Sequence, residues 1–210
     1  MVIPALHDAA SDQPIPYTPV CRRSTVVVCL HPAFRAFLGD EAAALDPVLG
    51  EVAGLPGAPV RAEQISTDAL IASNGAVMSA TPPVFHFPVP ITPGSFGVSS
   101  REFHATMANL FLTTFIAGSG ALAGRTGDPA QQAIETALLA AAGVRAAGPM
   151  GHAPGSPGRP PPGSAAARQL ARVLAAASRF GALPDAARHA WLKAHLAALR
   201  AGRITLGQLP

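Results

Sequence analysis

The chain has 210 residues, which suffices for one ordinary domain with an appendage and is short for two full domains. Apolar residues make up 49% of it, but only 5% are aromatic and 13% charged, so we expect a thin, alanine-rich core. No apolar stretch reaches the roughly 20 residues that a membrane-spanning helix needs, which excludes that class of protein.

Residues 1–24 predict a disordered leader, because they hold four prolines and no periodic apolar pattern. The pair Arg22-Arg23 precedes a short apolar run, an order also found in export signals. Residues 26–30 are too few for the apolar segment of such a signal. We therefore expect a cytoplasmic protein.

Two cysteines are too few for a disulfide framework, and their spacing does not match a zinc site. Cys29 falls in a predicted buried strand, where cysteine behaves as a small hydrophobic residue. Cys21 falls in the predicted leader. We expect neither a disulfide nor a metal from this pair.

Ordered structure is expected to begin with a strand over residues 25–30, a continuous run rich in β-branched residues. A helix follows over about 32–52, with Pro32 suited to its first turn. Further strands are predicted at 59–65, 70–73, 76–79 and 84–87. Asn74-Gly75 predicts a tight hairpin, and the prolines on both sides of 84–87 predict an edge strand.

Two more helices complete the expected body of the protein. Ser99 and Glu102 form a capping-box pattern before an amphipathic segment. Asp128-Pro129 starts the next helix, which Gly143 should end. Residues 25–147 are therefore expected to form an α+β domain, with a small, mostly antiparallel sheet and its helices on one face.

A linker and a helical segment follow this domain. Eleven of the sixteen residues 148–163 are Pro or Gly, a composition typical of a linker. Residues 164–210, the C-terminal arm, predict two helices, the first capped by Ser164, that pair through their apolar faces as an αα-hairpin. Trp191 is expected to be at least half buried, against the first arm helix near Leu170 and Leu174 or against the body.

Charge divides the chain into an acidic body and a basic arm. Residues 1–145 carry seven basic and eleven acidic residues, and residues 146–210 carry eight basic residues and one acidic one. Such asymmetry indicates a partner for the basic part, although exposed charges are often only solvated. The predicted partner-binding residues are Arg168, Arg172, Arg179, Trp191, Lys193 and Arg200.

The leading functional hypothesis is a non-catalytic interaction or adaptor protein, whose basic amphipathic arm binds another protein or a second copy of the chain. Motifs of phosphate loops, dinucleotide-binding folds, zinc peptidases and nucleophile elbows are absent from the sequence. We expect no cofactor and no metal, and an enzyme is the less favoured class.

Two alternatives remain open. One is a small metal-dependent or histidine-based hydrolase that uses His31, His86 and His104, with Glu63 and Glu102 nearby in the predicted elements. The other is an accessory protein that binds nucleic acid without sequence specificity through the basic arm.

Overall fold

The computed structural model describes residues 18–65, 76–87, 100–118, 128–144 and 160–210. Within them lie five strands: β1 (Val20–Arg23), β2 (Val27–Leu30), β3 (Arg61–Gln64), β4 (Val77–Ala80) and β5 (Pro83–Phe87). The α-helices there are α2 (Leu38–Val52), α4 (Ser100–Ala117), α5 (Pro129–Ala141), α6 (Ala165–Gly181) and α7 (Asp185–Arg200). Short 3-10 helices, η1 (Pro32–Phe37) and η3 (Leu206–Gln208), complete these elements. The α+β class is confirmed.

The sheet is mixed, and the prediction of a mostly antiparallel sheet was wrong. Its order is β1-β2-β3-β5-β4, with parallel β2–β3 and β3–β5 pairs and antiparallel pairs at both edges. The chain passes from β2 to β3 through α2, and a helical crossover of this kind joins parallel neighbours. The edge position predicted for β5 was also wrong, because β5 lies between β3 and β4. Pro83 is the first residue of β5, a position at which an inner strand tolerates proline.

Part of the predicted disordered leader is ordered. Val20–Arg23 form β1, which pairs antiparallel with β2 after a short turn at residues 24–26. The backbone N–H of Thr25 in this turn donates to the Asp46 carboxylate of α2 at 2.7 Å. Residues 1–17 lie outside the described residues, so the leader stays a prediction there.

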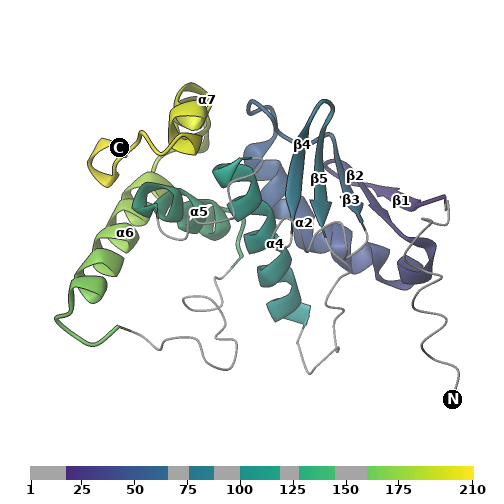
Figure 1. Ribbon diagram of the computed structural model, residues 1–210, viewed down its shortest axis with the longest axis horizontal. Coiled ribbons are helices and arrows are strands. Elements are labelled where there is room, and N and C mark those ends of the chain that lie inside the picture. The colour runs from purple at the N-terminus through teal and green to yellow at the C-terminus, as the bar shows by residue number, and fades with distance from the viewer. Residues whose placement is uncertain (1–17, 66–75, 88–99, 119–127, 145–159) are drawn as a thin grey trace, which may run out of the picture.

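Helices α2 and α4 cover one face of the sheet, as predicted (Figure 1). The inward row across four strands consists of Val28, Ala62, Phe85 and Met78. Phe111 of α4 meets Phe85 of β5 edge to face, with ring centroids 5.1 Å apart. None of the described helices lies on the opposite face, which therefore presents the outward residues of the strands.

Several predicted helix boundaries are confirmed by the cap residues. The Asp128 carboxylate accepts hydrogen bonds at the start of α5, and the Ser164 hydroxyl accepts one at the start of α6. Gly143 follows α5 with a positive φ of 69°, the conformation in which glycine ends helices. The predicted strand 70–73, the Asn74-Gly75 hairpin, the Ser99 cap and most of the linker lie outside the described residues.

The C-terminal helices share the core of the body. Helix α6 packs along α5, and α7 packs against α4 and α5. Val173 and Phe180 of α6 and Leu196 of α7 belong to the same buried cluster as the inner face of the sheet. The buried Gln131 amide of α5 donates to the Leu199 carbonyl oxygen at 2.9 Å. The region predicted as an arm is therefore docked on the body.

Trp191 is partly buried where α6 meets α7. Its ring lies edge to face on Phe180 at 5.3 Å between centroids and stacks on His195 at 4.5 Å. The predicted burial agrees with this position, and the first arm helix supplies the contact as predicted, through Phe180. Leu174, further along the same helix, is 50% exposed. The inner face of α6 is directed at α5 rather than along α7, so pairing of the two arm helices along their length is not observed.

A buried ion pair joins α7 to α2. Arg188 donates to the carboxylates of Glu51 and Asp185, both at 2.9 Å, and its side chain is only 6% exposed. We expect Arg188→Ala to lower the free energy of unfolding by about 2–3 kcal/mol, because Glu51 loses its partner and the packed side chain is removed. Chemical denaturation measures this, with Lys193→Ala on the exposed side of α7 as the control; equal effects of both substitutions contradict the assignment.

Glu41 is a carboxyl group inside the apolar stripe of α2. It is fully buried, and neither carboxyl oxygen has a hydrogen-bond partner in the structure. Burial, with a smaller contribution from Asp40, raises the pKa of Glu41 from 4.5 to about 8. Between these pH values the folded chain holds a proton that the unfolded chain has released, so stability falls as the pH rises.

We predict that Glu41→Gln removes this loss of stability. The gain in free energy of unfolding should be at most about 3 kcal/mol at pH 7 and under about 1 kcal/mol at pH 5. Denaturation at the two pH values measures it, with exposed Asp40→Asn as the control. Burial also raises the pKa of Glu135, to about 7, so in Glu41→Gln the free energy of unfolding should still fall somewhat as the pH rises. A gain of equal size at both pH values contradicts the prediction.

Candidate functional site

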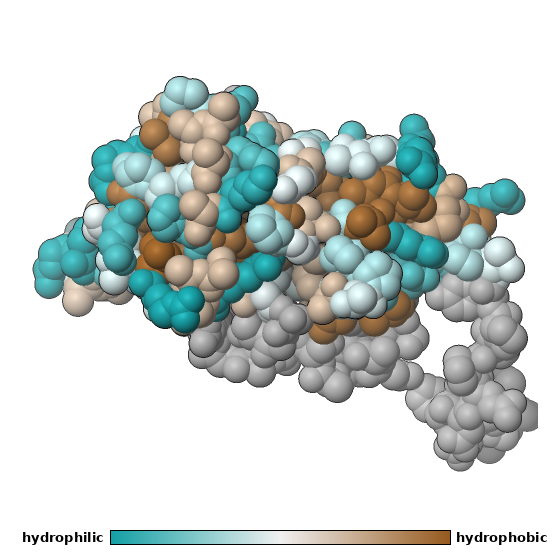
Figure 2. Space-filling view, turned by 90° about the horizontal axis from the view of Figure 1, so that it is seen from above, coloured by the Kyte–Doolittle hydropathy of each residue, from teal (hydrophilic) through white to brown (hydrophobic). Residues whose placement is uncertain are grey.

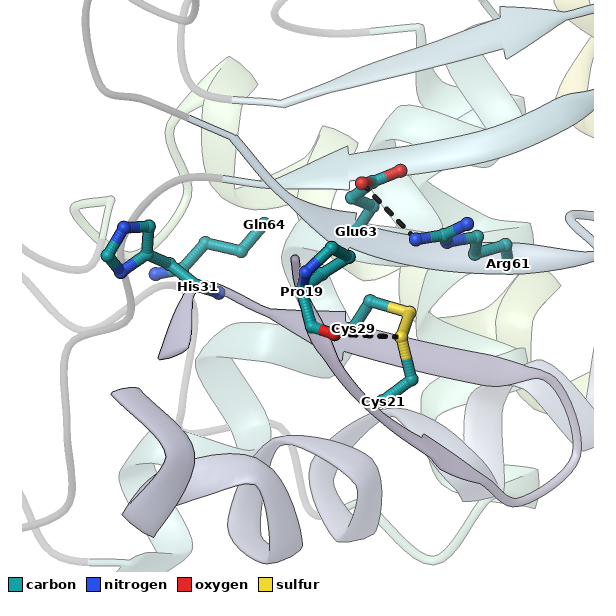
Figure 3. Close-up of a disulfide and its surroundings, with 7 residues drawn as sticks. All are labelled: Pro19, Cys21, Cys29, His31, Arg61, Glu63 and Gln64. Carbon is teal, nitrogen blue, oxygen red and sulfur yellow. Dashed lines mark hydrogen bonds and ion pairs between the residues drawn. A yellow bond between two sulfur atoms is a disulfide. The ribbon is translucent and has the colours of Figure 1, made fainter. Parts of the chain in front are cut away.

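The outward face of the sheet gathers polar residues from neighbouring strands. Cys29 of β2, Glu63 of β3 and His86 of β5 are register partners, so their side chains lie in one row on this face. Arg61 lies two residues before Glu63 and on the same side of β3 (Figure 3). Adjacent strands are about 4.8 Å apart, which places these groups within reach of one another.

A disulfide bond ends this row, and the expectation of two unpaired cysteines was wrong. Cys21 of β1 lies directly opposite Cys29 in the antiparallel register, with the Cα atoms 4.1 Å apart and the sulfurs bonded (Figure 3). Cys29 is fully buried, whereas Cys21 is exposed on the edge strand. The pairing follows from β1, which we had predicted to be disordered.

Electrostatic interactions couple Glu63 and His86 of the row to Arg61 beside it. An Arg61 Nη2 atom lies 3.3 Å from Glu63 Oε1. Burial lowers the pKa of His86 below its ordinary value, the Glu63 charge opposes this shift, and the Arg61 charge adds to it. Arg61 Nε and His86 Nδ1 are buried without a hydrogen-bond partner in the structure. The row thus offers one unused nitrogen donor and one histidine that favours the neutral form.

The other two candidate histidines lie elsewhere. His31 follows β2 and caps η1, where its Nδ1 accepts from the Ala33 N–H, and its own N–H donates to Gln64. His104 of α4 lies on the helix-covered side and lines an open groove of about 540 Å³ between α2, α4 and the end of α5. Glu102 is in the first turn of α4.

The structure therefore does not gather His31, His86 and His104 into one site. Within the parts of the chain that it describes, no group of three or more His, Cys, Asp or Glu side chains is arranged to hold a metal ion.

The predicted partner-binding residues fall into two groups. Arg168, Arg172 and Arg179 are exposed on α6, and Lys193 is exposed on α7. Arg200 is turned inward: its Nε donates to the Phe115 carbonyl oxygen at 3.1 Å, and its guanidinium lies 4.7 Å from the Phe115 ring centroid. Trp191 is likewise engaged within the chain.

Surface polarity differs between the two ends of the molecule. Figure 2 shows hydrophilic residues spread over the C-terminal helices and a hydrophobic patch over the sheet. Val60, just before β3, is 58% exposed. In the described part of the chain, no helix combines the length and apolarity required to cross a membrane.

Comparison with known proteins adds no assignment. No protein-family model matches the sequence, and neither a curated protein nor a solved structure matches it.

The charges around His86 give a testable order of pKa values. His86 should titrate below 6.5. Glu63→Gln should lower its pKa further, because it removes the negative charge that favours the imidazolium, and Arg61→Gln should raise it. A pH titration by NMR measures these values, with His86→Gln identifying the signal among the seven histidines. A pKa that rises in Glu63→Gln contradicts the arrangement.

Proposed function

We propose that the protein is a non-catalytic interaction protein and that the exposed basic side of α6 binds an acidic helix of a partner protein. The proposal rests on the exposure of Arg168, Arg172 and Arg179 and on the absence of ion pairing by them among the described residues. All three are exposed, and none forms an ion pair with any residue in the described parts of the chain.

The attachment of α6 supports a binding role for this surface. Val173, Ala176 and Phe180 hold the helix on the body, so the arginines are carried by a fixed element. Arg168 and Arg179 are eleven residues apart, which is about 16 Å along the helix axis. Because the helix backbone is already ordered, only the arginine side chains lose conformational freedom when a partner binds, and this favours affinity.

The residues beside the arginines favour a helix as the ligand. Ala171 and Ala175 are exposed on the same side of α6 and are small enough to let another backbone approach closely. Carboxylates on a helix at matching spacing can then pair with Arg168, Arg172 and Arg179, and arginine binds carboxylates through two parallel hydrogen bonds.

The alternatives have less support. Nucleic acid would use the same arginines, but the two remaining basic groups of the predicted set, Lys193 and Arg200, lie on α7, and Arg200 is engaged inside the chain. A histidine-based hydrolase needs side chains that converge, and His31, His86 and His104 are held apart. Self-association would have to use the acidic helix α2, but its Asp46 accepts from the Thr25 N–H, its Glu51 pairs with Arg188, and its Glu41 is buried. We keep the cytoplasm as the proposed location.

Charge reversal on α6 tests this function. The probe is a synthetic helical peptide with three glutamates, the second four residues and the third eleven residues after the first. Its binding is measured by fluorescence anisotropy at several salt concentrations. Wild type should bind it, and the triple variant R168E/R172E/R179E should bind at least tenfold more weakly. The control R22E/R23E/R203E changes the net charge equally at exposed arginines outside α6 and should stay within about twofold of wild type.

Two outcomes overturn the proposal. One is an equal loss of peptide binding in both triple variants, which indicates an effect of net charge alone. The other is tighter binding of a DNA oligonucleotide than of the peptide, with the steep salt dependence of phosphate contacts, which favours the nucleic-acid alternative.

A further inference from the structure

We infer that the Cys21–Cys29 disulfide is a thiol-exchange site and that it reacts with a small anionic thiol of the glutathione class. The reaction forms a mixed disulfide on Cys21 and releases Cys29. This inference is independent of the role proposed for α6, since it depends on the opposite end of the molecule and on different residues.

The two sulfurs differ in access, and this fixes which one is attacked. Cys21 is exposed on the edge strand β1, where no further strand of the described sheet covers it. Cys29 has no exposed surface and lies on β2 between β1 and β3. An attacking thiolate therefore reaches the Cys21 sulfur, and the Cys29 sulfur leaves.

The charges beside Cys29 belong to an ion pair and do not decide which sulfur leaves. Glu63 is the register partner of Cys29 on β3, and Arg61 lies two residues before Glu63 on the same side of the sheet. Arg61 Nη2 is 3.3 Å from Glu63 Oε1, so a positive and a negative charge accompany each other there. The difference in access between the two sulfurs therefore fixes the direction of attack.

The charge around Cys21 selects the thiol. Side chains alternate along a strand, so the exposed Arg23 lies on the same face of β1 as Cys21, two residues further on. Arg22 lies on the other face, close to Gly39 of α2. Arg23 attracts a thiol that carries carboxylates and repels one that carries an amine, since exposed like charges slow an encounter and opposite charges accelerate it. A small anionic thiol therefore fits this site better than a cationic one.

The exchange is balanced in atoms and electrons. A first thiol loses its proton to solvent and bonds to the Cys21 sulfur, while the S–S bond breaks and Cys29 leaves as a thiolate that takes up a proton. A second thiol then attacks the mixed disulfide, which yields the oxidised small molecule and the Cys21 thiol. Two external thiols are oxidised, and one protein disulfide is reduced to two thiols.

The hairpin can persist through this reaction. Four residue pairs join β1 to β2, and the Thr25–Asp46 hydrogen bond fastens their turn to α2. The disulfide spans only eight positions, and closing so short a loop restricts the unfolded chain less than a long one does. Once reduced, the Cys21 thiol can donate to the Pro19 carbonyl oxygen, which lies 4.0 Å from its sulfur (Figure 3).

Intact-mass spectrometry and peptide mapping of the full chain test the inference. The folded protein is incubated with reduced glutathione at pH 7.5 and quenched by alkylation. The expected intermediate carries one glutathione on Cys21 and the alkyl group on Cys29. In Cys29→Ser, oxidised glutathione should modify Cys21 rapidly, whereas Cys29 in Cys21→Ser should react at least about 100-fold more slowly, because it is buried.

Charge variants separate selection by Arg23 from simple exposure. In Arg23→Gln the rate with glutathione should fall and the rate with cationic cysteamine should rise, while Arg168→Gln changes neither rate. Circular dichroism checks that each variant is folded. Adducts on Cys29, reduction only under unfolding conditions, or equal preference for the two thiols in wild type would each refute the inference.

Discussion

The parallel pairing of β2 with β3 is the constraint on which the rest of the structure depends. Parallel neighbours require a crossover, and the chain makes it through α2, whose apolar side covers one face of the sheet. With α2 in place, α4 finds its position beside it, and α5, α6 and α7 extend the same core away from the sheet. The other face keeps the outward residues of the strands, including Cys29, Glu63 and His86.

The sequence was informative where local chemistry decides the structure. Asp128 and Ser164 are helix caps whose side chains satisfy nearby backbone N–H groups, so their role can be inferred from a few residues. The apolar runs that form β2 and β5 were likewise found from their composition. Burial of Trp191 followed from its size and its place on the apolar arc of α7, although its contact with Phe180 did not.

Features that depend on distant pairing were missed. Nothing in residues 20–23 has the apolar pattern of a buried strand, because β1 is an edge strand with mostly exposed side chains. The position of β1 opposite β2 was the only available signal for the disulfide: Cys21 and Cys29 are equally distant from the centre of the turn at residues 24–26. The contact of Arg200 with Phe115 joins residues far apart in the chain, and helical periodicity carries no information about it.

The packing of α6 on α5 has a consequence for the continuity of the chain. Phe180, Val173 and the Gln131–Leu199 hydrogen bond hold the C-terminal helices to the body by non-covalent contacts. These contacts do not depend on the peptide chain that connects Val144 to Pro160. Two separately produced fragments ending and starting near these residues therefore have the complementary surfaces of a split protein, each exposing the apolar face that the other covers.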